Sequence, residues 1–247
     1  MKDEQLLRYS RQIMLPQMDV AGQQKLIDAT VLIVGMGGLG CPAAMYLAAA
    51  GVGHLMIADD DVVELTNLQR QVAHSHSMIG QPKVVSAQQA LLGLNPDLKI
   101  TALQERLVGA NLSEAVSKAD LVLDACDNFT SRFAINAACI EHRKPLVSGA
   151  AIRMEGQIAV FDSRNPNSPC YQCLYSLGDD EDASCSENGV MAPLVGIIGA
   201  VQAMETIKLL TGIGESLTGR LLLLDASTLQ WREMRLPRDS NCGACSG

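Results

Sequence analysis

Four cysteines form two pairs with the spacing of metal ligands. Cys170 and Cys173 lie in one C-x-x-C segment, and Cys242 and Cys245 lie in a second segment near the last residue. Each pair can offer two thiolates to one tetrahedral ion, so the set matches a closed, structural zinc site. Two unrelated pairs or redox-active thiols are the alternatives. A redox pair normally opens a helix after a strand, and the second pair does not, which favours zinc.

A glycine-rich loop follows a short apolar run at residues 31–34. Gly35, Gly37 and Gly40 form G-x-G-x-x-G, with Gly38 inside it, and an alanine-rich helical stretch comes next. Glycines here let the backbone approach phosphate, while the helix N-terminus supplies N–H donors and partial positive charge. The motif therefore predicts a nucleotide site, and by itself it is most often part of a dinucleotide site.

Carboxylates follow the next apolar run. Asp59 stands at its end, where a carboxylate can accept hydrogen bonds from ribose hydroxyls, and Asp61 comes two residues later. We include both in the predicted nucleotide site. Up to this point an NAD-dependent oxidoreductase fits the pattern as well.

Two cations and two amides come after this acidic segment and separate the interpretations. The segment "NLQRQ" supplies Asn67, Arg70 and Gln71, and "GQPK" supplies Lys83. A triphosphate carries far more negative charge than the pyrophosphate of NAD, and its reactions need Arg, Lys and usually Mg²⁺. Either cation alone could be a solvated helix charge. Together, after one glycine loop, they favour ATP.

A third acidic segment, "DACDN", ends another apolar run. Asp124 and Asp127 would lie at the carboxyl edge of a parallel sheet, where the ligands of such sheets bind, and either could hold a metal through oxygen. We include Asn128 in the predicted nucleotide site. The alternative is structural, because Asp127 with Asn128 could cap the following helix.

The apolar runs that must position these residues alternate with helical stretches as far as residue 157. This alternation predicts a largely parallel sheet covered on both faces. From Ile158 onward strands dominate, apart from a polar loop and one apolar helix at about 193–211. We therefore predict a single α/β domain over 1–247. It has a Rossmann-like nucleotide-binding part at about 1–157 and a mixed β-sheet continuing into a C-terminal zinc-bearing part at about 158–247.

Composition excludes several classes of protein. The 247 residues carry a net charge of −8, which argues against a nucleic-acid partner. No apolar run is long enough for a membrane span, and the first residues are charged where a signal peptide would be apolar. A cytoplasmic protein is the prediction. In that reducing compartment eight cysteines favour metal ligands or packing residues over disulfides.

The motifs also occur in a recognisable order. From "LRYSRQI" through "GMGGLG", "NLQRQ", "GQPK", "DACDN" and "SGAAIRMEGQ" to "CGAC", the whole chain resembles the bacterial MoeB/ThiF/HesA adenylyltransferases, relatives of the ubiquitin-activating enzymes. The resemblance implies a protein that binds ATP and Mg²⁺. It implies adenylation of the C-terminal glycine carboxylate of a ubiquitin-like sulfur-carrier protein ending in Gly-Gly, with release of pyrophosphate. The product serves molybdopterin or thiamine biosynthesis.

The same resemblance implies roles for individual residues. It places Gly38 and its neighbours on the nucleotide, Asp59 on ribose, and Mg²⁺ on Asp127. It assigns phosphate contacts to Asn67, Arg70 and Lys83. Arg11 in "YSRQI" matches an arginine that reaches across a homodimer to the partner's ATP, and Cys185 matches a cysteine that can link to the carrier in the thiamine branch. The acidic neighbours of Cys185 would raise its pKa, so its chemistry has no independent support in the sequence.

The branch and the competing classes stay open at this level. "SGAAIRMEGQ" is closer to the molybdopterin branch, which we favour, whereas "ADDD" leans toward the thiamine branch. Because no sulfurtransferase segment follows the second cysteine pair, a separate sulfur-donating protein is expected. An NAD-dependent oxidoreductase and a non-catalytic carrier-binding scaffold are the alternatives of other classes. The four histidines show no metal-ligand pattern, and we assign them no role.

Overall fold

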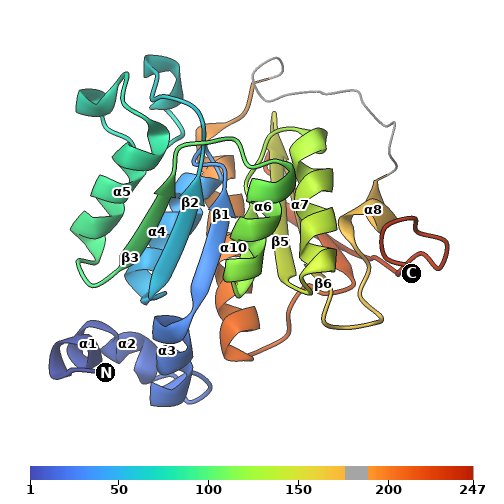
Figure 1. Cartoon of the computed structure of the whole chain (residues 1–247), viewed down its shortest axis with the longest axis horizontal. Coiled ribbons are helices and arrows are strands. Elements are labelled where there is room, and N and C mark those ends of the chain that lie inside the picture. The colour runs from blue at the N-terminus through green and yellow to red at the C-terminus, as the bar shows by residue number, and fades with distance from the viewer. Residues whose placement is uncertain (176–188, 247) are drawn as a thin grey trace.

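The computed structural model describes residues 1–175 and 189–246, and an eight-stranded sheet forms its centre. The strands lie in the order β3-β2-β1-β4-β5-β6-β7-β8 (Figure 1). Their bounds are β1 (Thr30–Val34), β2 (His54–Ala58), β3 (Lys99–Leu103), β4 (Leu121–Asp124), β5 (Pro145–Ile152), β6 (Glu155–Asp162), β7 (Arg220–Asp225) and β8 (Gln230–Arg235). The sheet joins the early and late parts of the described chain.

The sheet changes character along its width. β1 to β5 are parallel, whereas β6, β7 and β8 pair antiparallel. Val34, the last residue of β1, lies opposite Ala58 of β2 and Asp124 of β4. The strand order reverses beside β1, so the loops after β1 and β4 diverge and leave a crevice. The α/β class with a mixed sheet is confirmed.

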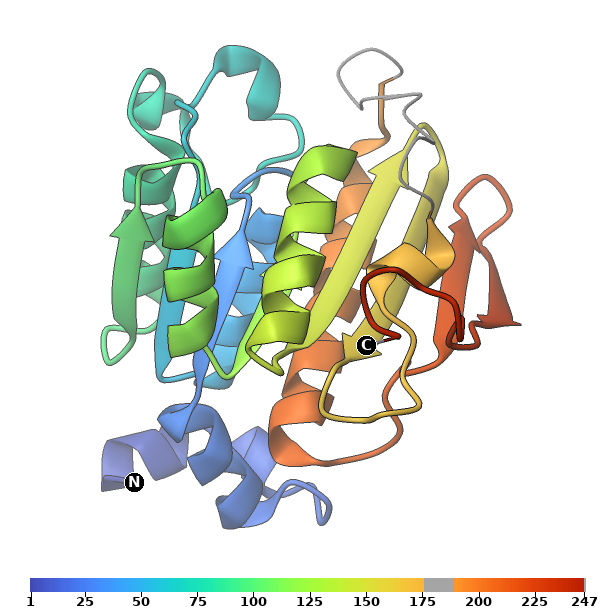
Figure 2. The same ribbon diagram turned by 45° about the vertical axis from the view of Figure 1, so that its right-hand side comes forward.

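Helices cover both faces of the parallel strands (Figure 2). α4, α5 and α10 pack on one face, and α6 and α7 pack on the other. Successive strand side chains point to opposite faces, so Val31 and Ile33 join the first core while Leu32 joins the second. The helix bounds are α3 (Asp19–Asp28), α4 (Gly40–Ala50), α5 (Lys83–Leu94), α6 (Gly109–Lys118), α7 (Phe129–Glu141), α8 (Tyr171–Leu174) and α10 (Ala192–Thr211), with short 3₁₀ turns η1 (Leu65–Asn67) and η2 (His76–Met78).

The long apolar helix α10 is a core element. Within the described ranges it is the one helix whose length and composition would allow it to cross a membrane, and half of its most apolar stretch is buried inside the protein. It packs against α4, β5 and β6. These contacts explain why it is apolar around most of its circumference.

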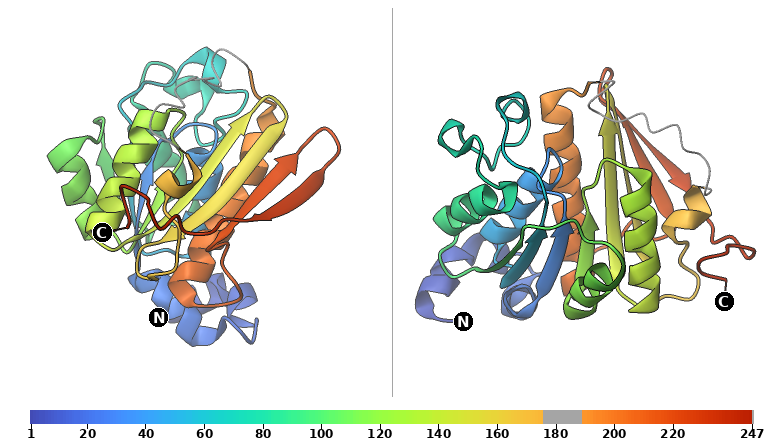
Figure 3. Two further views of the ribbon diagram at one scale, coloured as in Figure 1. Left: turned by 90° about the vertical axis from the view of Figure 1, so that its right-hand side faces the viewer. Right: turned by 45° about the horizontal axis from the view of Figure 1, so that its top comes forward.

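The N-terminal helices lie away from the crevice. α1 (Asp3–Arg8), α2 (Ser10–Ile13) and α3 lie at the amino ends of the parallel strands, beneath the sheet in the view of Figure 1. At the side opposite β3, the hairpin β7–β8 forms the edge of the sheet (Figure 3). All six residues of β8 are exposed.

Candidate active site

A cavity of about 810 Å³ occupies the crevice at the carboxyl ends of the parallel strands. The loops after β1, β2 and β4 contribute to its walls, together with residues of β5 to β8. It brings together ten residues that the sequence predicts for the nucleotide site: Gly35, Gly37, Gly38, Asp59, Asp61, Arg70, Gln71, Lys83, Asp127 and Asn128.

Two glycines of the loop are required by the backbone itself. Gly35 has φ +98°, and a Cβ there would lie 2.7 Å from the Ala125 carbonyl oxygen. At Gly40, which does not line the cavity, a Cβ would lie 1.9 Å from the carbonyl oxygen of Gly35. At Gly37 the nearest atom to a Cβ is Gln71 Nε2 at 3.7 Å, so this part of the loop is open to a ligand.

The carboxylate of Asp59 ties the glycine loop to β2. Its Oδ2 accepts a hydrogen bond from the Met36 N–H (2.7 Å), and its Oδ1 accepts one from the Asp61 N–H (2.9 Å). Burial raises the pKa of Asp59, while the charge of Lys83, whose Nζ lies 4.0 Å from Oδ1, opposes that rise. The acid is thus placed beside the loop, where the sequence puts a ribose contact.

Lys83 is buried at the first turn of α5 rather than solvated. Its side chain is 8% exposed, and its Nζ lies 2.7 Å from Asp61 Oδ2. The interpretation of Lys83 as a solvated helix charge is therefore wrong. Arg70 is half-buried in the cavity wall and donates from Nη1 to the Thr66 carbonyl (3.1 Å). Both cations that the sequence singles out therefore face one cavity.

Gln71 supplies a test of whether a nucleotide fits. Its side chain is buried, and its Oε1 has no hydrogen-bond partner within the described part of the chain. A buried amide oxygen without a partner costs free energy unless a ligand or water donates to it. Because Gln71 lines the cavity beside the open backbone at Gly37, a ligand with hydroxyl or amino donors, such as a nucleoside, would satisfy it.

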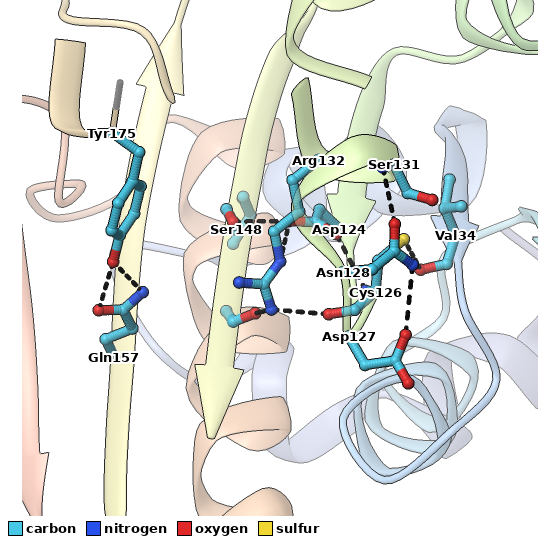
Figure 4. A network of polar contacts seen from close by, with 12 residues as sticks. Val34, Asp124, Cys126, Asp127, Asn128, Ser131, Arg132, Ser148, Gln157 and Tyr175 are labelled. Atoms are coloured by element: carbon cyan, nitrogen blue, oxygen red, sulfur yellow. Dashed lines mark hydrogen bonds and ion pairs between the residues drawn. The ribbon is translucent and has the colours of Figure 1, made fainter. Parts of the chain in front are cut away.

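The structure separates the two aspartates of "DACDN" (Figure 4). Asp124 is 1% exposed, and its oxygens accept from Cys126 N–H (3.0 Å) and Ser148 Oγ–H (2.7 Å). Asp127 is exposed at the cavity, and within the described ranges its Oδ1 accepts only from Asn128 Nδ2 (3.3 Å). Asn128 Oδ1 caps α7 by accepting from Ser131 N–H (2.9 Å). Asp127, not Asp124, is free to take a cation.

Arg132 is a cavity residue that the sequence analysis missed. It is nine-tenths buried, its Nη2 donates to the Cys126 carbonyl (2.7 Å), and its Nε lies 3.7 Å from Asp124 Oδ2 (Figure 4). The signal was its spacing four residues after the helix cap, which turns it toward β4. Other lining residues missed were Glu105 and Arg106 after β3, Gln157 on β6, Tyr175 after α8 and Arg232 on β8.

Asn67 and Arg11, like Gly40, do not line the cavity formed by the described residues. Asn67 Oδ1 accepts from the Glu64 N–H (3.2 Å) and caps η1. Arg11 is exposed on α2, whose Gln12 donates to the carbonyl of Ala50 at the far end of α4. Since α4 starts at the glycine loop and rises about 1.5 Å per residue, Arg11 lies roughly 15 Å or more from its own cavity. Cys185 lies outside the described residues.

The four cysteines meet as the sequence predicts. Sulfur–sulfur distances are 3.6 Å for Cys170–Cys242, 3.6 Å for Cys173–Cys245 and 3.9 Å for Cys170–Cys173. With Zn–S bonds of about 2.3 Å, the edge of a tetrahedral site is about 3.8 Å. The sulfurs are therefore at the separations that one zinc ion requires, and the donor set fits it. The C-terminal segment lies beside α8 (Figure 2).

An aromatic cluster lies between the cysteines and the cavity. It contains all three phenylalanines of the chain and two of its four tyrosines. Tyr171 of α8 packs edge-on against Phe133 of α7 and Phe161 of β6, and lies beside Tyr175. The Tyr171 N–H also donates to Asn136 Oδ1 of α7 (2.9 Å). Helix α7 therefore contacts both sites, since its N-cap, Asn128, lines the cavity.

Fold and cavity together define the class of protein: a Rossmann-like α/β protein with a glycine-loop cavity at the carboxyl ends of its parallel strands. Residues 9–244 match the ThiF family. The chain belongs to that family, and the resemblance read from its motifs is confirmed.

Individual relatives agree with this assignment. The molybdopterin-synthase adenylyltransferase of Escherichia coli strain K12 is 51% identical over 245 residues, covering 99% of this chain and 98% of that protein. The sulfur carrier protein ThiS adenylyltransferase of the same strain is 48% identical over 247 residues, covering 100% and 98%. A crystal structure of Escherichia coli MccB with MccA-N7isoASN aligns with a TM-score of 0.85 and 22% identity over 98% of this chain and 75% of that one, which supports the fold.

Proposed function

We propose that this protein uses ATP to adenylate the C-terminal glycine carboxylate of a ubiquitin-like sulfur-carrier protein, releasing pyrophosphate. The observation that carries the proposal is one cavity in which a glycine loop, Asp59, two cations and a free carboxylate converge, in a chain half identical to enzymes named for this reaction. The carrier of molybdopterin biosynthesis is the first choice, because the 51% identical relative carries that name.

The predicted residues each have a role in that reaction. Asp59 accepts from the ribose hydroxyls, and the open backbone at Gly37 and Gly38 receives the phosphates. Gln71 and Asn128 make further contacts to the nucleotide. Arg70 and Lys83 offset the charge of the triphosphate, with Asn67 supporting the turn that carries Arg70.

The chemistry needs no nucleophile from the protein. The carrier's carboxylate attacks the α-phosphorus, forming an acyl-phosphate bond while the bond to pyrophosphate breaks. Both reactants are anions, so the site must offset their repulsion and hold them in line. In the described structure Lys83 Nζ lies 2.7 Å from Asp61 Oδ2 and 4.0 Å from Asp59 Oδ1, and binding of phosphate would draw its single positive charge toward the ligand.

Two metals are part of the proposal. Asp127 is the side chain that would hold Mg²⁺, because its carboxylate faces the cavity and, of the residues that the structure describes, Asn128 alone donates a hydrogen bond to it. Bound Mg²⁺ would neutralise phosphate charge. Cys170, Cys173, Cys242 and Cys245 would hold Zn²⁺, a structural ion without an open coordination position.

The assembly is a homodimer in this proposal. Arg11 is too far from its own cavity to contact a nucleotide there, so it would serve the site of the partner subunit. A separate sulfur-donating protein would convert the acyl-adenylate to a thiocarboxylate. We further infer that the reaction takes place in the cytoplasm. The role of Cys185 as a link to the carrier stays a prediction.

The similarity to known proteins supports one of the two alternative functions and not the other. The same reaction on the thiamine-pathway carrier is supported by the 48% identity to the ThiS adenylyltransferase. An NAD-dependent oxidoreductase has no such support, because the relatives are named adenylyltransferases.

Pyrophosphate exchange tests the proposal. Purified protein is mixed with ATP, Mg²⁺ and labelled pyrophosphate, and each candidate carrier is added separately. Label should enter ATP only when one carrier is present, which identifies the reaction and the carrier together. Carriers lacking the two C-terminal glycines are the matched control.

No exchange with either carrier, in folded protein that binds ATP, would contradict the proposed reaction. Tight binding of NADH without binding of ATP would favour the oxidoreductase instead.

A further inference from the structure

A buried histidine lies against the glycine loop without lining the cavity. His74 is 8% exposed and belongs to the loop that connects Gln71 to α5. Its Nε2 lies 3.0 Å from the carbonyl oxygen of Met36, inside the glycine loop. Its Nδ1 lies 3.0 Å from Ser86 Oγ of α5, the helix that begins with Lys83. One imidazole therefore bridges two walls of the site.

The partners fix the protonation of this imidazole. A carbonyl oxygen can only accept, so Nε2 must carry the proton and donate to Met36. Nδ1 then accepts from the hydroxyl of Ser86. Burial lowers the pKa of His74 and favours the neutral form that this arrangement uses.

Hydrogen bonds hold the two peptide units that flank Met36. Its N–H donates to Asp59 Oδ2 (2.7 Å), and its carbonyl accepts from His74 and from Cys41 Sγ (3.3 Å). Directly after it, the N–H groups of Gly37 and Gly38 have no backbone acceptor in the described ranges. The Met36 carbonyl and the Gly37 N–H belong to one planar peptide unit, so holding the carbonyl also sets the direction of the Gly37 N–H. The Gly38 N–H follows in the next peptide unit.

We propose that His74 is a positioning residue of the nucleotide site: it holds the Met36 carbonyl in the protein interior so that the Gly37 and Gly38 amides stay available to phosphate. The inference rests on the proposed function for the identity of the ligand. It assigns a role to a residue that the sequence left without one.

His54 is a hydrogen-bonded histidine that does not contact the glycine loop. It lies on β2 between Thr30 Oγ1 (3.4 Å from Nδ1) and Thr101 Oγ1 (2.8 Å from Nε2). Its ring is also hydrogen-bonded at both nitrogens, but at the amino end of β2, away from the glycine loop. It is the matched control for any effect of replacing a bonded histidine.

The test uses variants that keep or lose one nitrogen. A glutamine amide nitrogen can occupy the place of Nε2, whereas an asparagine amide reaches only the place of Nδ1. We expect His74→Asn and His74→Leu to raise the KM for ATP about tenfold, as for one lost hydrogen bond, with kcat changed less. The KM of His74→Gln for ATP should stay within about threefold of the parental value. The KM of the control, His54→Gln, should equal the parental value.

A second readout needs no nucleotide. Hydrogen–deuterium exchange of the peptide spanning Gly35 to Cys41 should be faster in His74→Asn than in His74→Gln, at equal Tm. Ser86→Ala, which removes the distal partner and leaves the ring in place, should show the same change to a smaller extent.

The outcomes separate the two proposals. Equal exchange of the loop in the Asn and Gln variants, or an equal KM for ATP, would overturn the role of His74. If the parent protein does not bind ATP, the proposed function fails, while loop exchange still decides whether His74 holds the loop.

Discussion

The nucleotide cavity and the cysteine cluster are organised by opposite means. The cavity walls come from the ends of paired strands and the first turns of long helices, which the sheet places whether or not a ligand is bound. The cysteines come from a four-residue helix, α8, with its N-cap, and from an irregular segment near the C-terminus, and Cys242 follows Cys170 by 72 positions. The second site has little regular structure of its own to hold it.

This difference predicts how each site responds to loss. Where topology positions the groups, removal of one side chain should remove chemistry and leave the fold. Where sulfur ligands join two irregular segments, removal of the ion should release structure, because metal binding there contributes folding free energy.

The largest expected effect is on catalysis. Asp127→Asn should lower the rate of pyrophosphate exchange about 100- to 1,000-fold, as expected when a group that stabilises charge in the transition state is lost. Its Tm should stay close to that of the parent, because the side chain is exposed and accepts one hydrogen bond. Exchange kinetics and calorimetry of the same sample measure both quantities.

Asp124→Asn is the contrasting variant. It leaves the buried Arg132 without its carboxylate, so Tm should fall by roughly 10 °C. If Asp127→Asn lowered Tm as much as Asp124→Asn, the idea that the cavity is preformed and that Asp127 contributes only to its chemistry would be contradicted.

Next in size is removal of the proposed zinc ion. A chelator, or Cys242→Ser, should lower Tm by roughly 10 °C and expose the segment 236–246 to proteolysis, since metal binding there is folding free energy. ATP affinity, measured by calorimetry, should change less than tenfold, because the sheet holds the cavity. A metal-free sample with four free thiols and unchanged Tm would contradict the zinc proposal.

Mixing two inactive variants tests whether Arg11 of one subunit serves the cavity of the partner subunit. Arg11→Ala and Asp127→Ala, each with little exchange activity, should recover about a quarter of parental activity when their dimers are allowed to exchange subunits. Half of the dimers would then be mixed, with one intact site each. No recovery, with subunit exchange shown by mass spectrometry, would place Arg11 outside the reaction.

The smallest predicted effect concerns pH. Burial holds the pKa of His74 below its ordinary value of 6.5, with Lys83 acting in the same direction, and the Met36 carbonyl and Asp59 opposing it. The folded protein therefore binds fewer protons than the unfolded chain below this pH, and stability is lost as pH falls.

The loss traceable to His74 should develop as pH falls from about 7 to about 5. Urea unfolding at several pH values would measure it, with His74→Gln showing the flatter profile. An identical pH dependence in both proteins would contradict the assignment of a neutral, buried His74.

Local pattern was enough to predict the strands and most of the cavity. The glycine loop, Asp59 and "DACDN" each follow an apolar run, and parallel strands bring their carboxyl ends to one edge. The proposed zinc site was equally predictable from the sequence, because the spacing of the four cysteines has few other uses. In both cases residue type and position pointed to the same chemistry.

Other residues carried no such signal. Arg232 and Gln157 reach the cavity from β8 and β6 only because the antiparallel extension packs beside β5, a long-range fact that no local motif encodes. His74 looked ordinary because its meaning depends on the Met36 carbonyl, 38 positions away in sequence. Spacing alone likewise does not separate Asp124 from Asp127: the family resemblance implied Asp127, and the structure adds that Asp124 is buried.

Helix α7 belongs to both sites: its cap, Asn128, borders the cavity, and its Asn136 accepts from Tyr171 beside the cysteines. Any energetic coupling between the two sites through α7 must be reciprocal. The factor by which bound metal changes nucleotide affinity then equals the factor by which bound nucleotide changes metal affinity. Chelator titrations with and without ATP would then measure one linkage constant from either end.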